Sequence, residues 1–167
     1  TSVKRAGSSC TFNRLVSDKM SLLNYSTKVS VEKTATEISR ALAQAKAQAV
    51  LTEFGKDGVL EAISFRITSP YGLMSFRLPA NIDKILAVLV RDKRLAPKLR
   101  TREQASRVAW RIVKDWLEAQ LAMVLAEQVT AEQVFLPYLQ NDAGETLYEV
   151  LKDKRFHGLA LPEVKKV

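Results

Sequence analysis

Cysteine and histidine are almost absent from this chain. Among its 167 residues there is one cysteine, Cys10, and one histidine, His157. A disulfide needs two cysteines, and zinc sites or other metal centres draw most of their ligands from several cysteine or histidine side chains. The composition therefore excludes an internal disulfide, a cysteine-rich zinc site and a multi-histidine metal site. We expect neither a metal nor a cofactor.

Glycine is scarce as well, and no hydrophobic run is long. The six glycines form neither a phosphate-binding loop of the Walker type nor the Gly-x-Ser-x-Gly turn of α/β hydrolases. The longest apolar run, residues 85–90, is much shorter than the ~20 residues that cross a bilayer. No apolar stretch of the signal-peptide kind follows Lys4 and Arg5. We therefore expect a cytoplasmic protein with no membrane span.

Catalytic motifs are equally scarce. A nucleophile–histidine site would have to use His157, which lies near the end of the chain in a context more typical of a surface residue. A pair of carboxylates brought together by the fold stays open as a minor alternative. The leading expectation is a non-enzymatic protein.

Length and composition favour one folded domain, since the chain is 47% hydrophobic and of single-domain size. We expect this domain at residues 29–158, between a flexible N-terminal arm at 1–28 and a loose tail at 159–167. Residues 1–19 lack any periodicity. They either precede a natural start at Met20 or belong to the arm.

Hydrophobic periodicity predicts one helix, then three strands, then further helices. Ser30 is suited to cap a helix that begins at Val31. The expected strands are residues 50–54, 59–68 and 73–78, and the expected later helices start at 82, 102 and 145. This α-β-β-β-α-α-α order predicts an α+β fold. Its sheet is a three-stranded antiparallel meander, with one face covered by helices that include one long central helix.

The lengths of the two turns predict the register of the strands. A four-residue first turn places Val50 opposite Ile63, and a four-residue second turn places Phe65 opposite Phe76. Because side chains alternate along a strand, both registers put these residues and Phe54 on one apolar face.

Capping signatures mark the later helices. Thr101 and Gln104 have the spacing of a capping box at the start of the long helix. Thr130 and Gln133 repeat the signature. The chain could begin a short helix there that ends near Pro137, or the long helix could run straight through.

The net charge of +8 is unevenly distributed. Residues 80–115 carry ten Lys or Arg against four Asp or Glu, whereas residues 116–167 carry five against eight. A basic stripe of this kind could follow nucleic-acid phosphates with weak sequence specificity, through DNA or RNA alike. The candidate binding residues are Arg66, Arg77, Lys93, Arg94, Lys98, Arg100, Arg102, Arg107, Arg111 and Lys114. The competing interpretation is an ordinary solvated helix face.

The apolar second half of the long helix supports an alternative function. It would make the protein an oligomeric or protein-interaction module that binds a second copy or a phage or host protein. The candidate interface residues are Trp110, Leu121, Val124 and Phe135. The competing interpretation is that the tryptophans are core residues.

Three segments carry a resemblance, namely residues 101–120, the Val-Phe-Leu-Pro-Tyr run at 134–138 and the Phe-Arg-Leu-Pro-Ala run at 76–80. Together they resemble a group of small uncharacterised proteins encoded in bacteriophages, prophages and other mobile elements. The likeness spans Met20 to about Gly158. It implies a mobile-element setting for an accessory protein and brings no assigned activity, fold or site.

Overall fold

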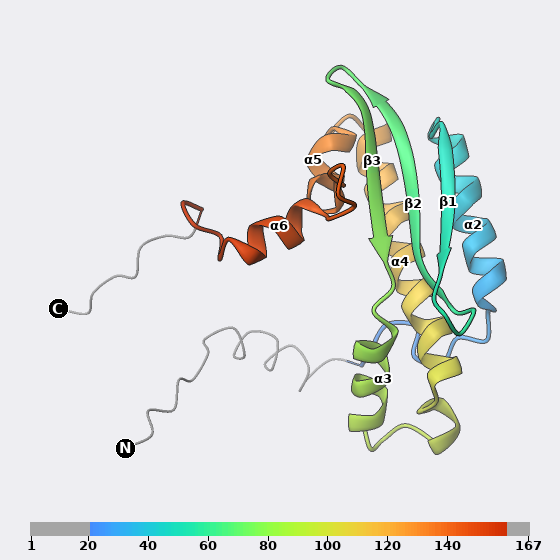
Figure 1. The fold of residues 1–167 in the computed structure, drawn as a ribbon. Coiled ribbons are helices and arrows are strands. Elements are labelled where there is room, and N and C mark those ends of the chain that lie inside the picture. The colour runs from blue at the N-terminus through green and yellow to red at the C-terminus, as the bar shows by residue number, and fades with distance from the viewer. Residues whose placement is uncertain (1–20, 160–167) are drawn as a thin grey trace, which may run out of the picture.

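The computed structural model describes residues 21–159, which form a three-stranded antiparallel sheet with helices packed on one face (Figure 1). In chain order the elements are α2 (Val31–Gln44), β1 (Ala49–Phe54), β2 (Leu60–Ser69), β3 (Gly72–Pro79), α3 (Ile82–Arg91), η1 (Pro97–Leu99), α4 (Arg102–Leu125), α5 (Ala131–Phe135), η2 (Leu136–Tyr138) and α6 (Leu147–Asp153). The predicted α+β fold, with its meander and long helix, is confirmed. Most of the predicted arm and tail, at 1–20 and 160–167, lies outside the described residues.

The core lies between the sheet and the helices. Phe65 and Phe76 stack with ring centroids 5.3 Å apart, and Phe135 of α5 packs edge-on against Phe65 at 5.2 Å. Trp110 of α4 is fully buried, and its indole N–H donates to the carbonyl of Leu60 at 3.1 Å. This bond satisfies the one polar group that burying a tryptophan would otherwise leave unpaired.

The second hairpin has the register that its turn predicted, with Phe65 opposite Phe76. The first hairpin does not, because Val50 lies opposite Phe65 instead of Ile63. Its loop holds the five residues 55–59 and not four. The pairing is displaced by two residues, and since side chains alternate, Val50 still lies on the predicted face.

A β-bulge at the end of this hairpin corrects one predicted core residue. The pairing shifts between Glu53 and Phe54, which leaves Glu61 as an extra residue in β2. Beyond the bulge the alternation reverses, so Leu60 joins the core while Glu61 is exposed. Phe54 is 63% exposed, and its predicted place on the buried apolar face is wrong.

Capping residues set where the helices begin and where the long helix stops. The Ser30 hydroxyl accepts from the backbone N–H of Lys33, which confirms the predicted start of α2. At Thr130 both halves of the capping box with Gln133 form. A new helix therefore starts there, and α4 ends at Leu125 instead of running through.

The predicted capping box at Thr101 forms only in part. The Thr101 hydroxyl accepts from the Gln104 backbone N–H, as expected. The Gln104 side chain, however, does not return to the cap. It is buried and donates to the carbonyls of Tyr25 and Thr27, at 3.0 and 2.9 Å. This amide thus fastens the segment that precedes α2 onto α4.

The segment after α5 attaches to the free edge of β3. The backbone N–H of Gln140 donates to the Ser75 carbonyl at 2.8 Å. A turn follows at 141–144, and α6 starts at a capping box between Thr146 and Glu149. Figure 1 shows α6 projecting sideways from the sheet, beside the end of β3. Residues of α6 and of the start of α3 border one cavity.

Candidate nucleic-acid interface

The basic stripe on α4, defined as Arg107, Arg111 and Lys114, consists entirely of paired cations. Arg111 donates to Glu37 of α2 at 2.5 Å, and only 17% of the Arg111 side chain is exposed. This hydrogen bond holds the pKa of Glu37 below its usual range. The other two pairs lie within α4 and join Arg107 to Glu103 and Lys114 to Glu118. The stripe therefore offers a phosphate little uncompensated charge.

Arg66 and Arg77 lie on the sheet face that points away from the helices. Arg77 donates to Glu53 at 2.8 Å, and the Ser64 hydroxyl donates to the same carboxylate at 2.5 Å. Burial raises the pKa of Glu53, but these two bonds lower it by more, so the net pKa lies below its usual range. Arg66 is exposed and has no carboxylate within 4.0 Å among the described residues. Because the sheet separates this face from α4, neither arginine extends the stripe.

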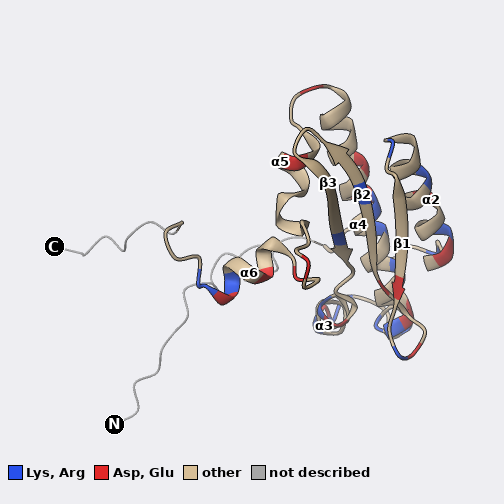
Figure 2. Cartoon of the chain, turned by 45° about the horizontal axis from the view of Figure 1, so that its top comes forward, with Lys and Arg blue, Asp and Glu red and all other residues tan. Residues whose placement is uncertain are grey.

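The linker between α3 and α4 holds four of the predicted cations. Arg94 donates two side-chain hydrogen bonds to the carboxylate of Asp92, and this hydrogen bonding lowers the pKa of Asp92 to about 2. Arg100 donates to two backbone carbonyls of the linker. Lys93 and Lys98 are exposed and have no ion pair within residues 21–159. The ten predicted residues are thus divided among α4, the sheet and the linker, and the blue Lys and Arg positions of Figure 2 are spread over several elements.

The predicted interface residues divide in two. Trp110 and Phe135 are 0% and 1% exposed, so in this fold they pack the core and present no surface to a partner. Leu121 and Val124 are half-buried. The interpretation of Trp110 as a core residue agrees with the structure. Trp110 is buried because α4 packs against the sheet with this side chain on its inward face.

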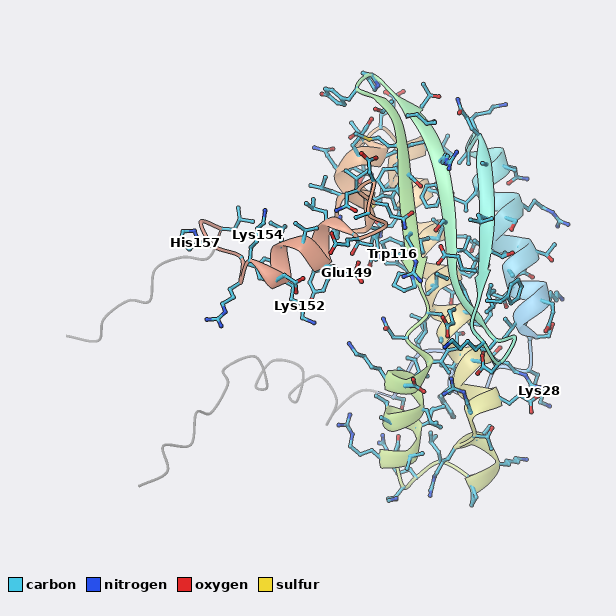
Figure 3. All side chains as sticks on the ribbon, viewed as in Figure 1. Lys28, Trp116, Glu149, Lys152, Lys154 and His157 are labelled. Atoms are coloured by element: carbon cyan, nitrogen blue, oxygen red, sulfur yellow. The ribbon has the colours of Figure 1, made fainter. Side chains whose placement is uncertain are left out.

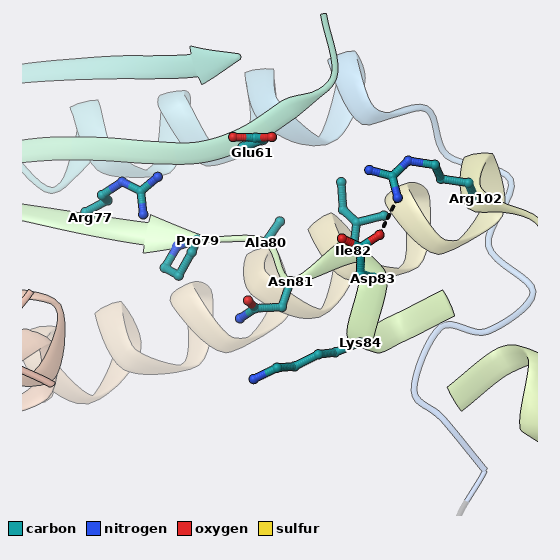
Figure 4. Close-up of a pocket in the computed structure, with 9 residues that line it drawn as sticks. All are labelled: Glu61, Arg77, Pro79, Ala80, Asn81, Ile82, Asp83, Lys84 and Arg102. Carbon is teal, nitrogen blue, oxygen red and sulfur yellow. Dashed lines mark hydrogen bonds and ion pairs between the residues drawn. The ribbon is translucent and has the colours of Figure 1, made fainter. Parts of the chain in front are cut away.

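A cavity of about 370 Å³ opens where β3 ends and α3 begins (Figure 4). It is lined in part by Arg77, Lys84 and Arg102, and we call it the α3 cleft. Arg102 is paired with Asp83, whereas Lys84 extends away from that pair. The charge of Arg102 is therefore paired inside the cleft, whereas Lys84 forms no ion pair within residues 21–159, although the carboxylate of Glu61 also lines this cleft.

A second cavity, of about 460 Å³, adjoins the first and separates α3 from α6. We call it the α6 cleft. Its lining consists of Arg77, Pro79, Asn81, Lys84, Pro137, Tyr138, Thr146, Tyr148, Glu149 and Lys152. Three elements thus direct cations at one cavity, with Arg77 from β3, Lys84 from α3 and Lys152 from α6. Neither Lys84 nor Lys152 has an ion pair among the described residues.

Glu149 is the one carboxylate in the lining of the α6 cleft, and it already accepts hydrogen bonds from the N-terminal cap of α6. It accepts from the backbone N–H and the hydroxyl of Thr146, at 2.7 and 2.8 Å. The backbone hydrogen bond is the main reason why the pKa of Glu149 lies below its usual range. Figure 3 shows Glu149 and Lys152 together on α6, on the opposite side of the molecule from Lys28.

Lys84 and Lys152 are functional candidates that the sequence did not reveal. Lys84 belongs to the basic region but lies outside its clustered part. Lys152 belongs to the C-terminal third, whose net charge is −3. A count of charge along the chain points away from Lys152, which reaches the cleft only because α6 and the start of α3 border one cavity in the fold.

Metal ligands, His157 and membrane spans were the other features that the sequence raised. Among residues 21–159, no three His, Cys, Asp or Glu side chains gather as a metal site would require. His157 is exposed in the turn after α6 (Figure 3). In the same residues no helix combines the length and the apolar character needed to cross a bilayer.

Comparison with known proteins gives no match, because no protein-family model, curated protein or solved structure is significantly similar to this chain. The resemblance to mobile-element proteins stays a prediction.

Proposed function

We propose that the protein binds the phosphate backbone of nucleic acid through the α6 cleft and the exposed face of α3. The observation that carries this proposal is the meeting of Arg77, Lys84 and Lys152 around one cavity, with both lysines free of ion pairs among the described residues. A free lysine releases counterions when it meets a phosphate, and this release drives most non-specific binding to nucleic acid. A cation already held by a carboxylate gains much less.

The exposed face of α3 continues the basic surface away from the cleft. Lys84 and Arg91 are seven residues apart, so they lie on one side of the helix about 10 Å from each other. Both are exposed. Lys93 and Lys98, which belong to the predicted binding set, follow in the linker where α3 ends. A chain of phosphates leaving the cleft would therefore meet further cations along α3.

Backbone contacts of this kind carry little sequence information. Lys84, Lys152 and Arg91 have long flexible side chains, and none of the three makes a side-chain hydrogen bond within residues 21–159. We therefore expect weak sequence preference and strong dependence on salt.

The test is binding to fluorescein-labelled single- and double-stranded DNA and RNA, measured by anisotropy at ~50 mM salt, a condition that favours phosphate contacts. The double variant Lys84→Glu/Lys152→Glu should bind about 10- to 100-fold more weakly than the wild type. Its matched control is Lys28→Glu/Arg40→Glu, which makes the same change in net charge on the α2 side of the molecule and should stay within about twofold.

Two results would overturn the proposal. One is a wild-type protein that binds none of the four nucleic acids. The other is an equal loss of affinity in the cleft variant and its control, since this would reduce the effect to net charge alone.

A further inference from the structure

The α6 cleft contains aromatic rings as well as cations. Tyr138 of η2 and Tyr148 of α6 both line it. Tyr148 is 52% exposed, so much of its side chain is open to solvent. The strand phenylalanines Phe65 and Phe76, in contrast, are buried between the sheet and the helices. Two other exposed aromatic side chains, Phe54 and Tyr71, lie outside the lining of the α6 cleft. Tyr148 is therefore the exposed ring that borders the same cavity as the two lysines.

A neighbouring aromatic ring contacts each of these two tyrosines. The ring of Tyr138 packs edge-on against Trp116 of α4, with centroids 5.3 Å apart. The ring of Tyr148 lies 6.0 Å from Phe156, in a tilted arrangement. Such contacts fix the ring orientation before a ligand arrives, which lowers the entropy lost on binding.

Tyr148 and Lys152 are four residues apart on α6, so they lie on the same face of the helix one turn apart. Both border the same cavity. An exposed ring beside a free ammonium group matches the two parts of a nucleotide, because the ring can stack on a base while the cation meets the adjacent phosphate.

The size of the cavity favours a single strand over a duplex. About 460 Å³ is within the range of small-molecule pockets. A base in a duplex is stacked on both faces and cannot lie on a protein ring unless it leaves the helix, which costs energy. For a base in a single strand, the energy needed to leave the stack is much smaller.

Resting on the proposed function, we infer that the α6 cleft takes an unpaired nucleotide of a single strand, with its base stacked on Tyr148 and its phosphate near Lys84 and Lys152. Stacking accepts any base, because every base has a flat π-face. The inference therefore assigns the single strand as the preferred ligand and keeps the sequence preference weak.

The experiment compares a 12-residue deoxythymidine strand with an abasic 12-mer that has the same phosphates and no bases. The wild-type protein should bind the deoxythymidine strand about 5- to 150-fold more tightly, the range that one stacked base provides. Tyr148→Ala should remove most of this preference and leave the affinity for the abasic strand unchanged. Tyr148→Phe should retain it, because the ring is kept.

The control is Tyr71→Ala, which removes an 83% exposed tyrosine from the turn between β2 and β3 and should change neither affinity. Circular dichroism of every variant reports whether the fold is intact. The inference is overturned if the wild type binds both strands equally, or if Tyr148→Ala weakens both strands alike. In either case a loss of binding in Lys84→Glu/Lys152→Glu would leave the proposed function standing. Absence of any binding by the wild type would overturn both.

Discussion

The α4 stripe and the α6 cleft are two basic regions that differ in whether their cations are paired with carboxylates. In the stripe, Arg107, Arg111 and Lys114 each have a carboxylate partner. In the cleft, Lys84 and Lys152 have none among the described residues. The stripe is the denser cluster in sequence, yet its charge is used to hold α2 against α4 and to stabilise α4 itself. Pairing, and not the number of cations, therefore decides which basic surface can attract an anion.

The largest expected effect comes from reversing the cation of the stripe that joins α4 to α2. Arg111→Glu would set a new carboxylate against Glu37, and we expect the free energy of unfolding to fall by about 1.5–3 kcal/mol, the range for hydrogen bonds to charged groups. Urea unfolding followed by tryptophan fluorescence measures this. Lys84→Glu, at an exposed and unpaired position, should stay within about 0.5 kcal/mol of the wild type. Similar losses in the two variants would remove the distinction between the regions.

Neutralising one cation in each region tests the comparison through binding. Lys84→Gln should weaken binding to single-stranded DNA about three- to tenfold and reduce the slope of log affinity against log salt by about 0.7, the value for one phosphate contact in a single strand. Arg107→Gln should leave that slope unchanged, since Arg107 is already paired with Glu103. Titrations between about 50 and 200 mM salt give both slopes. A slope lowered equally by Arg107→Gln would show that the stripe binds as well.

A smaller effect, in the direction of tighter binding, is expected at Glu149. Glu149→Gln removes the carboxylate from the α6 cleft but keeps the capping box, because glutamine serves equally well at this position. We expect the affinity for single-stranded DNA to rise about two- to fivefold at low salt, as a unit charge some 10 Å from a phosphate would predict. The control is Asp153→Asn, which removes an exposed charge from α6 outside the cleft lining. An equal gain in the control would assign the effect to net charge.

The smallest effect concerns Asp92, which pairs with Arg94 in the linker. Its pKa is lowered from 3.8 to about 2, mainly by the hydrogen bond from Arg94. A carboxyl whose pKa is lowered by folding stabilises the protein above its unfolded pKa and loses that contribution as the pH falls through the folded pKa. We therefore expect the difference in thermal stability between wild type and Asp92→Asn to be constant above about pH 5 and to shrink between pH 4 and pH 2. A difference that does not change over this interval would contradict the role of the pair.

The sequence predicted well wherever the relevant interaction is local. Ser30 and Thr130 cap the helices that they were expected to cap, since a cap involves residues only three positions apart. The register of the second hairpin follows from its short turn. The predicted register of the first hairpin was wrong, because its loop has five residues and a bulge leaves Glu61 unpaired. The bulge turns Leu60 into the core, where its carbonyl accepts from the distant Trp110.

The candidate site was less predictable for the same reason. Of the ten cations that sequence reasoning selected, Arg77 alone lines the α6 cleft. The signal of a capping box at Thr146 and Glu149 was available and would have placed the start of α6. No pattern in the sequence, however, indicates that residues of α6 and of the start of α3 line one cavity.

By itself the sequence determined the α+β class, the order of the elements and the buried strand face, because periodicity and capping act over a few residues. The tertiary structure decided the pairing of those cations whose partners are distant in sequence. Arg111 meets a carboxylate 74 positions away, and Arg77 meets one 24 positions away. Lys84 and Lys152 come from segments of opposite net charge and meet at one cavity. Electrostatic potential depends on distance in space, and that distance is set only when the chain has folded.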